Sequence, residues 1–285
     1  MADSYRIIDS WCNLFTPASM KKNFIDNPEM AHVVGLWHMS GRTRGWTPAE
    51  FAQVLDASGV STAIIPVWQS RSWKFQTMLW DMKLEEVAEV MRHDPKRYKG
   101  MFGINPHHKM EGVKALEREV KEHGFIAAHL HHYGYGLRPD DKAFFPFYAK
   151  CVELNVPLMI QMGHSAELMP SEVGRPIHLD EIALYFPELT IIAGHTGWPW
   201  VEELIAMAWK HANVYIATTA HSPKYWDKSL VHFINSRGRG KVMFGTDFPV
   251  LTHAGSINEI DKLGLKPESR KALMHDTAAK VFKLD

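Results

Sequence analysis

Eight short apolar runs recur along the chain, and each is followed by a polar turn and then by an amphipathic stretch. Such runs are typical of buried strands, and the stretches between them have the apolar spacing of helices. Parallel strands need crossover connections, and eight of them close a sheet without leaving an edge. The pattern therefore predicts an α/β fold, a (β/α)8 TIM barrel. The runs span residues 5–9, 61–67, 98–104, 125–130, 156–161, 189–193, 213–217 and 241–245.

The alternative fold is a doubly wound open sheet, but no Gly-rich phosphate loop follows an early strand. The 285 residues contain no repeat and no Gly/Ser linker, so we predict one barrel domain over residues 1–285. Residues 14–47 are too long for a plain loop and are predicted to form an inserted cover segment over the active site. The sequence Thr47-Pro48-Ala49-Glu50 is typical of a capping box that opens the next helix.

The charge and cysteine content bear on partners and compartment. Lys and Arg together number 32, as do Asp and Glu, so nothing in the net charge favours nucleic acid or an anionic membrane. No apolar run approaches the ~20 residues that span a bilayer. Two cysteines favour a reducing, cytoplasmic location without disulfides. The expected partner is therefore a small-molecule substrate, with no nucleic acid and no membrane.

Histidines gather directly after the predicted strands, at the end where parallel barrels carry their chemistry. Asp247 follows the eighth run in the same way. A carboxyl group there is a candidate general base or metal ligand, or else an N-cap for the next segment. The residues that follow the runs are Trp11, Asn13, His129, His131, His132, Tyr133, His164, His195, His221 and Asp247.

His129 and His131 are two residues apart on a predicted strand, which places them on one face with Cα atoms roughly 6.6 Å apart. Imidazoles at that spacing can bind Zn²⁺, Mn²⁺ or Fe²⁺, with a carboxylate such as Asp247 completing the site. The alternative is a polar barrel interior in which the histidines form hydrogen bonds with one another. The spacing alone leaves both interpretations open.

The motifs 194–200 (GHTGWPW) and 245–249 (GTDFP), together with Ile8-Asp9 and Gly163-His164, resemble the amidohydrolase superfamily. The resemblance is to the amidohydrolase-2 branch, which includes aminocarboxymuconate semialdehyde decarboxylase, resorcylate decarboxylases and pyrone dicarboxylate lactonase. It implies a distorted barrel with His164 as a metal ligand. It also implies that His195 is metal-proximal or catalytic, and that Asp247 is both ligand and general base.

One departure from the family pattern concerns the first strand. Where the family has Asp-x-His-x-His, this chain has Asp9-Ser10-Trp11-Cys12-Asn13. The indole of Trp11 cannot bind a metal, and the amide of Asn13 binds one weakly. Either the metal is absent, or the chain is a divergent subunit, or a rearranged set of ligands holds the metal. That set is His129, His131, His164, His195 and Asp247.

These observations predict a hydrolase or lyase that acts on a small, aromatic or ring-derived carboxylate or acyl compound. Asp247 is the predicted general base and His195 the second catalytic residue. The predicted cofactor is Zn, Mn or Fe, unless the enzyme is metal-free. The alternatives are a non-catalytic partner subunit and an oxygen-activating Fe or Mn enzyme. A homo-oligomer, or a hetero-oligomer with a homologous subunit, is expected. The predicted substrate-binding residues are Trp11, Asn13, Trp68, Tyr133 and His221.

Overall fold

The computed structural model describes residues 5–284. It contains an eight-stranded parallel sheet in which the strands follow one another in chain order. A doubly wound sheet reverses its strand order at a switch point, and no reversal occurs here, so the predicted barrel is confirmed. The strands are β1 (Ile7–Asp9), β2 (Val60–Pro66), β5 (Tyr98–Gly103), β6 (Ala127–Leu130), β7 (Leu158–Gln161), β8 (Ile191–Gly194), β9 (Val214–Ala217) and β10 (Val242–Met243).

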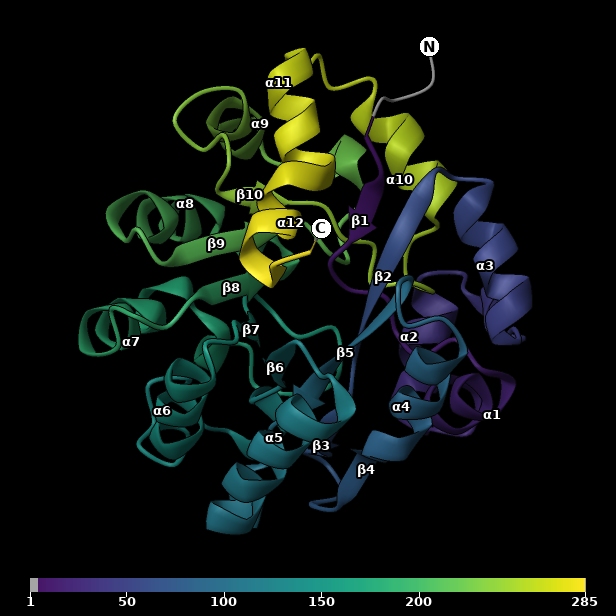
Figure 1. Cartoon of the computed structure of the whole chain (residues 1–285), viewed down its shortest axis with the longest axis vertical. Coiled ribbons are helices and arrows are strands. Elements are labelled where there is room, and N and C mark those ends of the chain that lie inside the picture. The colour runs from purple at the N-terminus through teal and green to yellow at the C-terminus, as the bar shows by residue number, and fades with distance from the viewer. Residues whose placement is uncertain (1–4, 285) are drawn as a thin grey trace.

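Helices surround the strands, as Figure 1 shows. None of the helices within residues 5–284 is long and apolar enough to cross a membrane. The helices that follow the strands are α3 (Pro48–Asp56), α4 (Leu84–His93), α5 (Lys109–His123), α6 (Phe145–Leu154), α7 (Leu179–Tyr185), α8 (Val201–Lys210), α9 (Lys228–Ile234), α10 (His253–Ile260), α11 (Pro267–Lys271) and α12 (Thr277–Phe282).

The barrel closes between β1 and β10 through backbone hydrogen bonds that lie just beyond the strands. The amide of Ser10 donates to the carbonyl of Phe244 at 3.1 Å, and the amide of Asp247 donates to the carbonyl of Trp11 at 2.8 Å. The carboxylate of Asp9 reinforces this seam by accepting from both the amide and the hydroxyl of Thr246. Closure beyond the strand ends therefore places Trp11 beside Asp247.

One layer of apolar side chains, one from each strand, fills the barrel interior. Val281 and Phe282 of α12 pack against this layer, so the C-terminal helix closes one end of the barrel. Trp11 belongs to the same cluster and is 2% exposed. Because α12 closes the end at which the strands begin, the end at which they finish is the open one. The layer consists of Ile8, Ile64, Met101, Ala127, Met159, Ile192, Tyr215 and Met243.

The cover segment predicted over residues 14–47 is largely helical. It contains α1 (Pro17–Met20), a π-helical turn (Lys21–Ile25), α2 (Met30–Leu36) and a 3₁₀ turn (Ser40–Arg42). The predicted capping box of α3 is confirmed, because the Thr47 hydroxyl accepts from the Glu50 amide and the Glu50 carboxylate accepts from the Thr47 amide.

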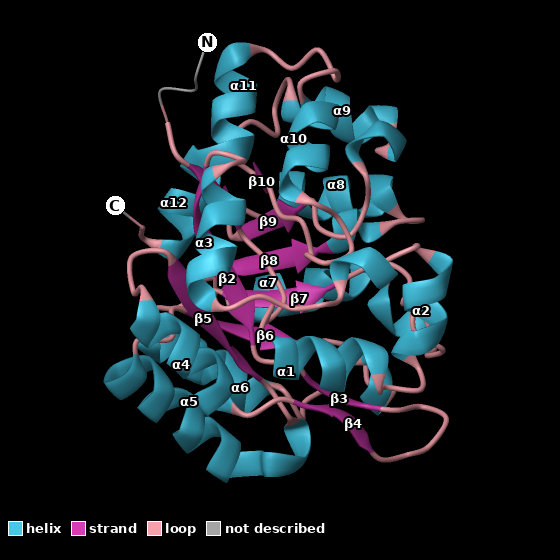
Figure 2. Ribbon diagram, turned by 90° about the vertical axis from the view of Figure 1, so that its right-hand side faces the viewer, coloured by secondary structure: helices cyan, strands magenta, loops and turns pink. Residues whose placement is uncertain are grey.

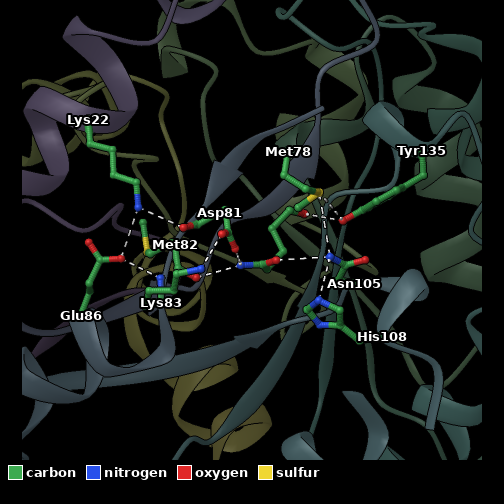
Figure 3. Close-up of polar contacts among 10 residues, drawn as sticks. Lys22, Met78, Asp81, Met82, Lys83, Glu86, Asn105, His108 and Tyr135 are labelled. Carbon is green, nitrogen blue, oxygen red and sulfur yellow. Dashed lines mark hydrogen bonds and ion pairs between the residues drawn. The ribbon is translucent and has the colours of Figure 1, made fainter. Parts of the chain in front are cut away.

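A second insertion follows β2. It is an antiparallel hairpin of β3 (Gln69–Arg71) and β4 (Met78–Asp81), which Figure 2 shows beside α1 at the edge of the barrel. Polar contacts hold the hairpin on both sides, as Figure 3 shows. Lys22 of the cover segment donates to the Asp81 carbonyl at 3.0 Å, and the Gln69 amide donates to the Asp81 carboxylate at 3.0 Å. Asn105, after β5, donates to Gln69 in turn.

Candidate active site at the open end of the barrel

A cavity of about 770 Å³ opens where the strands end. Its polar wall comes from the loops after the strands, and its apolar wall comes largely from the cover segment. Seven residues that the sequence predicted as site residues line it: Trp11, Asn13, Trp68, His164, His195, His221 and Asp247.

Asp247 is held by a chain of side chains from the loop after β1. The indole Nε1 of Trp11 donates to Asn13 Oδ1 at 3.2 Å, and Asn13 Nδ2 donates to Asp247 Oδ1 at 2.8 Å. Burial raises the pKa of Asp247 well above its usual value; the hydrogen bond from Asn13 opposes the shift, while the charges of Glu167 and Asp9 add to it. This environment favours the protonated carboxyl group, which can donate a proton.

His195 follows β8 and has a backbone φ of 66°, in the sparsely populated left-handed region. Its amide donates to Thr219 Oγ1 at 3.0 Å, and its Nδ1 lies 2.7 Å from the same oxygen. A hydroxyl that accepts from the amide can donate its own proton to Nδ1, which leaves the ring proton on Nε2. Burial, followed by the charge of His221, lowers the pKa of His195 to about 3. The side chain is thus a neutral imidazole near pH 7.

His164 and His221 lie close together at the cavity wall, with ring centroids 6.4 Å apart. The Nδ1 of His164 lies 3.0 Å from the Ser165 carbonyl. A carbonyl only accepts, so Nδ1 carries the proton and Nε2 is an acceptor in the neutral ring. Burial and then the charge of His164 lower the pKa of His221 to about 4. The imidazole of His221, like that of His195, is therefore uncharged near pH 7.

Three predicted site residues lie behind the cavity lining. His129 is 1% exposed, and its Nδ1 lies 3.3 Å from the Val67 carbonyl. His131 is fully buried against Trp80, with Nδ1 2.7 Å from the Ser70 hydroxyl. Tyr133 is 1% exposed and donates to the Gly163 carbonyl at 2.8 Å. This hydrogen bond supports the loop that carries His164.

Sequence reasoning missed Glu167, which lines the cavity three residues after His164. Its Oε2 accepts from the Ser165 hydroxyl at 2.5 Å, and its Oε1 lies 3.6 Å from His131 Nε2. Burial acts to raise the pKa of Glu167, but the interactions with His131 and Ser165 outweigh it and lower the pKa to about 2. The signal available in the sequence was its position in the loop after a predicted strand.

The site also contains a cation from the cover segment, Arg42. Arg42 Nη1 donates to the Val250 carbonyl at 2.6 Å, and Nη2 donates to the Trp37 carbonyl at 2.9 Å. These bonds tie the end of the cover segment to the loop after β10. The guanidinium therefore fixes the apolar wall relative to Asp247.

A parallel barrel with titratable groups at the ends of its strands is the architecture of a barrel enzyme. Residues 37–284 match the model of the amidohydrolase family, and the chain belongs to this family. The resemblance found in the sequence is thereby confirmed. A curated relative, gamma-resorcylate decarboxylase from Polaromonas sp. (strain JS666), is 23% identical over 246 residues, which cover 70% of this chain and 74% of that protein.

Solved structures with low sequence identity share the fold. An uncharacterized TIM-barrel protein from Bordetella bronchiseptica has a TM-score of 0.78 at 20% identity, covering 98% of this chain and 99% of its own. The 5-carboxyvanillate decarboxylase from Novosphingobium aromaticivorans, solved with manganese and a nitrobenzoic acid, has a TM-score of 0.74 at 18% identity, covering 99% and 97%. A dihydroxybenzoic acid decarboxylase from Polaromonas sp. JS666, with manganese and 2-nitroresorcinol, has a TM-score of 0.68 at 17% identity, covering 98% of both chains.

At the cavity, the described residues do not bring three donor atoms close together for such a metal ion. Within residues 5–284, the one trio of potential ligands with atoms within 4.8 Å of one another is Asp9, Cys12 and His253, in the β1–β10 seam. Among the described residues, no trio from the set expected from the sequence meets this distance, so that set stays a prediction. The indole of Trp11 lies between two of its members, with ring centroids 4.6 Å from His129 and 4.9 Å from His195.

Proposed function

We propose that this enzyme is a decarboxylase of an aromatic or ring-derived carboxylate, and that Asp247 moves the proton. The observation that carries the proposal is the pair of carboxyl groups at one cavity. Asp247 is held by Asn13 in surroundings that favour its protonated form, whereas Glu167 is ionised. Carboxyl groups whose surroundings push their pKa values apart typify acid–base sites. The curated relative and two of the similar structures named above are decarboxylases of aromatic acids.

In the proposed reaction, Asp247 donates its proton to the ring carbon that bears the carboxylate. The bond between that carbon and the carboxylate then breaks, its electron pair returns to the ring, and carbon dioxide leaves. The Asp247 carboxylate regains a proton from water, so one carboxylate and one proton yield the arene and carbon dioxide. His195, with its ring proton on Nε2, donates a hydrogen bond to a substrate oxygen.

The charge of the lining suits an anionic substrate. With Asp247 protonated, the charged residues at the cavity are Arg42 and Lys224 against Glu167. Lys224 also forms an ion pair with Glu259 at 3.7 Å, so of the two lining cations Arg42 is the one whose charge is left for a substrate carboxylate. Neutral imidazoles add hydrogen-bond donors without the cost of burying a further charge.

We also propose that the reaction runs without a bound metal ion, because Trp11 and Asn13 stand where the family has two histidines. The test is metal content. Wild-type protein incubated with Mn²⁺ or Zn²⁺ and then desalted is expected to retain neither. The double substitution Trp11→His with Asn13→His is expected to gain one equivalent. One equivalent in wild type that disappears in His164→Ala would overturn the proposal. An ion that is lost in Cys12→Ser is one bound by Asp9, Cys12 and His253 in the β1–β10 seam and does not count as a cavity ion.

The activity itself is tested with a panel of hydroxybenzoates in D₂O. Decarboxylation is expected to place one deuterium at the vacated ring carbon. Asp247→Asn is expected to lower turnover about 100-fold or more with the fold retained, whereas Asp26→Asn, on the exposed cover segment, is a matched control. Unchanged turnover in Asp247→Asn refutes the assigned role.

Hydrolysis is the second candidate, because a probable 2-pyrone-4,6-dicarboxylic acid hydrolase from Acinetobacter baumannii shares the fold at a TM-score of 0.64. In that reaction the ionised Asp247 acts as the general base that the sequence predicted. Incorporation of ¹⁸O from water into a ring-opened acid, without release of carbon dioxide, distinguishes it. The partner-subunit, oxygen-activation and oligomer expectations stay predictions; purification with a homologous chain, oxygen consumption and light scattering test them respectively.

A further inference from the structure

The cavity is larger than a single-ring acid requires. A dihydroxybenzoate has about eleven heavy atoms; even if each took the ~30 Å³ of a water molecule in the liquid, which is an upper limit for bonded atoms, it would occupy no more than about 330 Å³. The cavity measures about 770 Å³, within the range of sites that enclose drug-sized ligands. More than half of its volume therefore lies beyond the space needed by the reacting ring.

The surplus space faces an apolar wall. Phe24, Met30 and Val33 of the cover segment line the cavity and are at most 2% exposed. Leu36 lines it at the rim, where the side chain is 59% exposed. The acid–base groups all come from the loops after the strands, so the polar and apolar linings belong to different parts of the chain.

Arg42 makes the apolar wall part of the site rather than a loosely placed flap. Its guanidinium joins the Trp37 carbonyl at the end of α2 to the Val250 carbonyl in the loop after Asp247. On the other side, Lys22 joins the π-helical turn to the hairpin at Asp81. The wall is therefore anchored at both ends of the segment that carries Met30 and Val33.

We infer that the natural substrate is an amphipathic acid, in which an apolar alkyl or aryl group extends from the reacting ring onto α2. This inference rests on the proposed function for the position of the carboxylate. A small polar acid would leave the exposed part of this wall, chiefly Leu36 at the rim, facing water, whereas an apolar extension removes that surface and its own from water at once. The chemical class is thus a ring carboxylate with a hydrophobic substituent remote from the carboxyl group.

The test is the binding of 4-alkylbenzoates, from methyl to hexyl, followed by the quenching of tryptophan fluorescence or by calorimetry. Each added methylene is expected to lower the dissociation constant about threefold, so that it falls more than about 100-fold from the methyl to the hexyl compound. A dissociation constant that does not change with chain length overturns the inference, because the surplus volume then holds water. Failure of every member, benzoate included, to bind at the cavity instead counts against the proposed function.

A matched pair of variants locates the effect. Met30→Gln replaces an apolar wall residue by a polar one of similar length, and Met110→Gln makes the same change at a side chain that is 56% exposed on α5. Met30→Gln is expected to flatten the chain-length dependence, whereas Met110→Gln is expected to leave it at the wild-type value. If Met30→Gln lowers the melting temperature, Leu36→Gln at the rim replaces it. The inference is overturned if the ratio of the dissociation constants of the hexyl and methyl compounds is the same in both wall variants as in wild type.

Discussion

His132 provides a direct test of how the buried histidines govern stability. Its side chain is fully buried, and neither ring nitrogen has a hydrogen-bond partner within the described structure. The ring packs edge-on against Tyr133 at 4.5 Å. Burial, and then the charges of His131, His178 and His129, lower the pKa of His132 well below its usual value. The substitution His132→Phe keeps the ring and removes the titration.

The direction in which pH changes the stability follows from the protons that His132 binds in the folded and unfolded states. The folded protein keeps His132 neutral, whereas the unfolded chain binds a proton at that position below pH about 6.5. Stability from the neutral ring is therefore fully present above pH about 6.5 and is lost as the pH falls. The loss is about 1.4 kcal/mol per pH unit, so lowering the pH from 6.5 to about 5 removes roughly 2 kcal/mol.

Urea unfolding at pH 7 and pH 5, followed by circular dichroism, measures the effect. His132→Phe is expected to be about 1 kcal/mol more stable than wild type at pH 7, because it removes two unpaired polar atoms. The advantage is expected to grow by roughly 2 kcal/mol at pH 5. The exposed His232, changed to Phe, is the control and gains no such advantage. If wild type and His132→Phe lose equal stability between the two pH values, the reasoning is wrong.

Three further predictions concern the site and the hairpin. Turnover is expected to fall as the pH rises through the raised pKa of Asp247, because the acid form donates the proton; a pH–rate profile without a basic limb contradicts this. Asn13→Ala removes the donor to Asp247 and is expected to lower kcat about tenfold with little change in KM, as steady-state kinetics with a folded variant would show. Gly134→Ala would place a Cβ 1.8 Å from the Arg71 carbonyl and is expected to destabilise the fold by about 3 kcal/mol or more in urea unfolding. Gly41→Ala, where a Cβ meets nothing within 4 Å, is its control.

The barrel could be predicted from the sequence because its strands are buried on both faces and form short, almost continuous apolar runs. The weakest match is the eighth run. Residues 241–245 were predicted, but β10 covers only Val242–Met243. The reason is that the loops, rather than the strands, make the closing hydrogen bonds, from Ser10 to Phe244 and from Asp247 to Trp11. A sequence pattern reports burial and carries no information about where a barrel closes.

The hairpin could not be predicted because its stability is not local. Strand β3 consists of Gln69, Ser70 and Arg71, which lack an apolar alternation. The contacts that hold it reach to Asn105 after β5, as well as across to Asp81. Sequence periodicity reports neighbours along the chain, so a polar strand fixed by distant partners resembles a loop.

His129 and His131 have different surroundings for a related reason. Residues that are two positions apart lie on the same face only while the strand continues. Strand β6 ends at Leu130, so His131 already belongs to the turn and contacts Ser70 and Trp80, whereas His129 contacts Trp11. Asp247 and His195 line the cavity. Position after a strand determines the end of the barrel at which a residue lies, and this much could be read from the sequence.

Trp11 connects the proposed chemistry with the proposed substrate. Its indole occupies the space between His129 and His195, and its Nε1 supports Asn13, which holds Asp247. Proton donation by Asp247 depends on a raised pKa, and burial is the largest contribution to that shift. An apolar substituent lying on the cover segment would displace water from the same cavity and keep the carboxyl group dry. Longer 4-alkyl substrates are therefore expected to raise kcat as well as tighten binding, which separates substrate-driven exclusion of water from a passive apolar pocket.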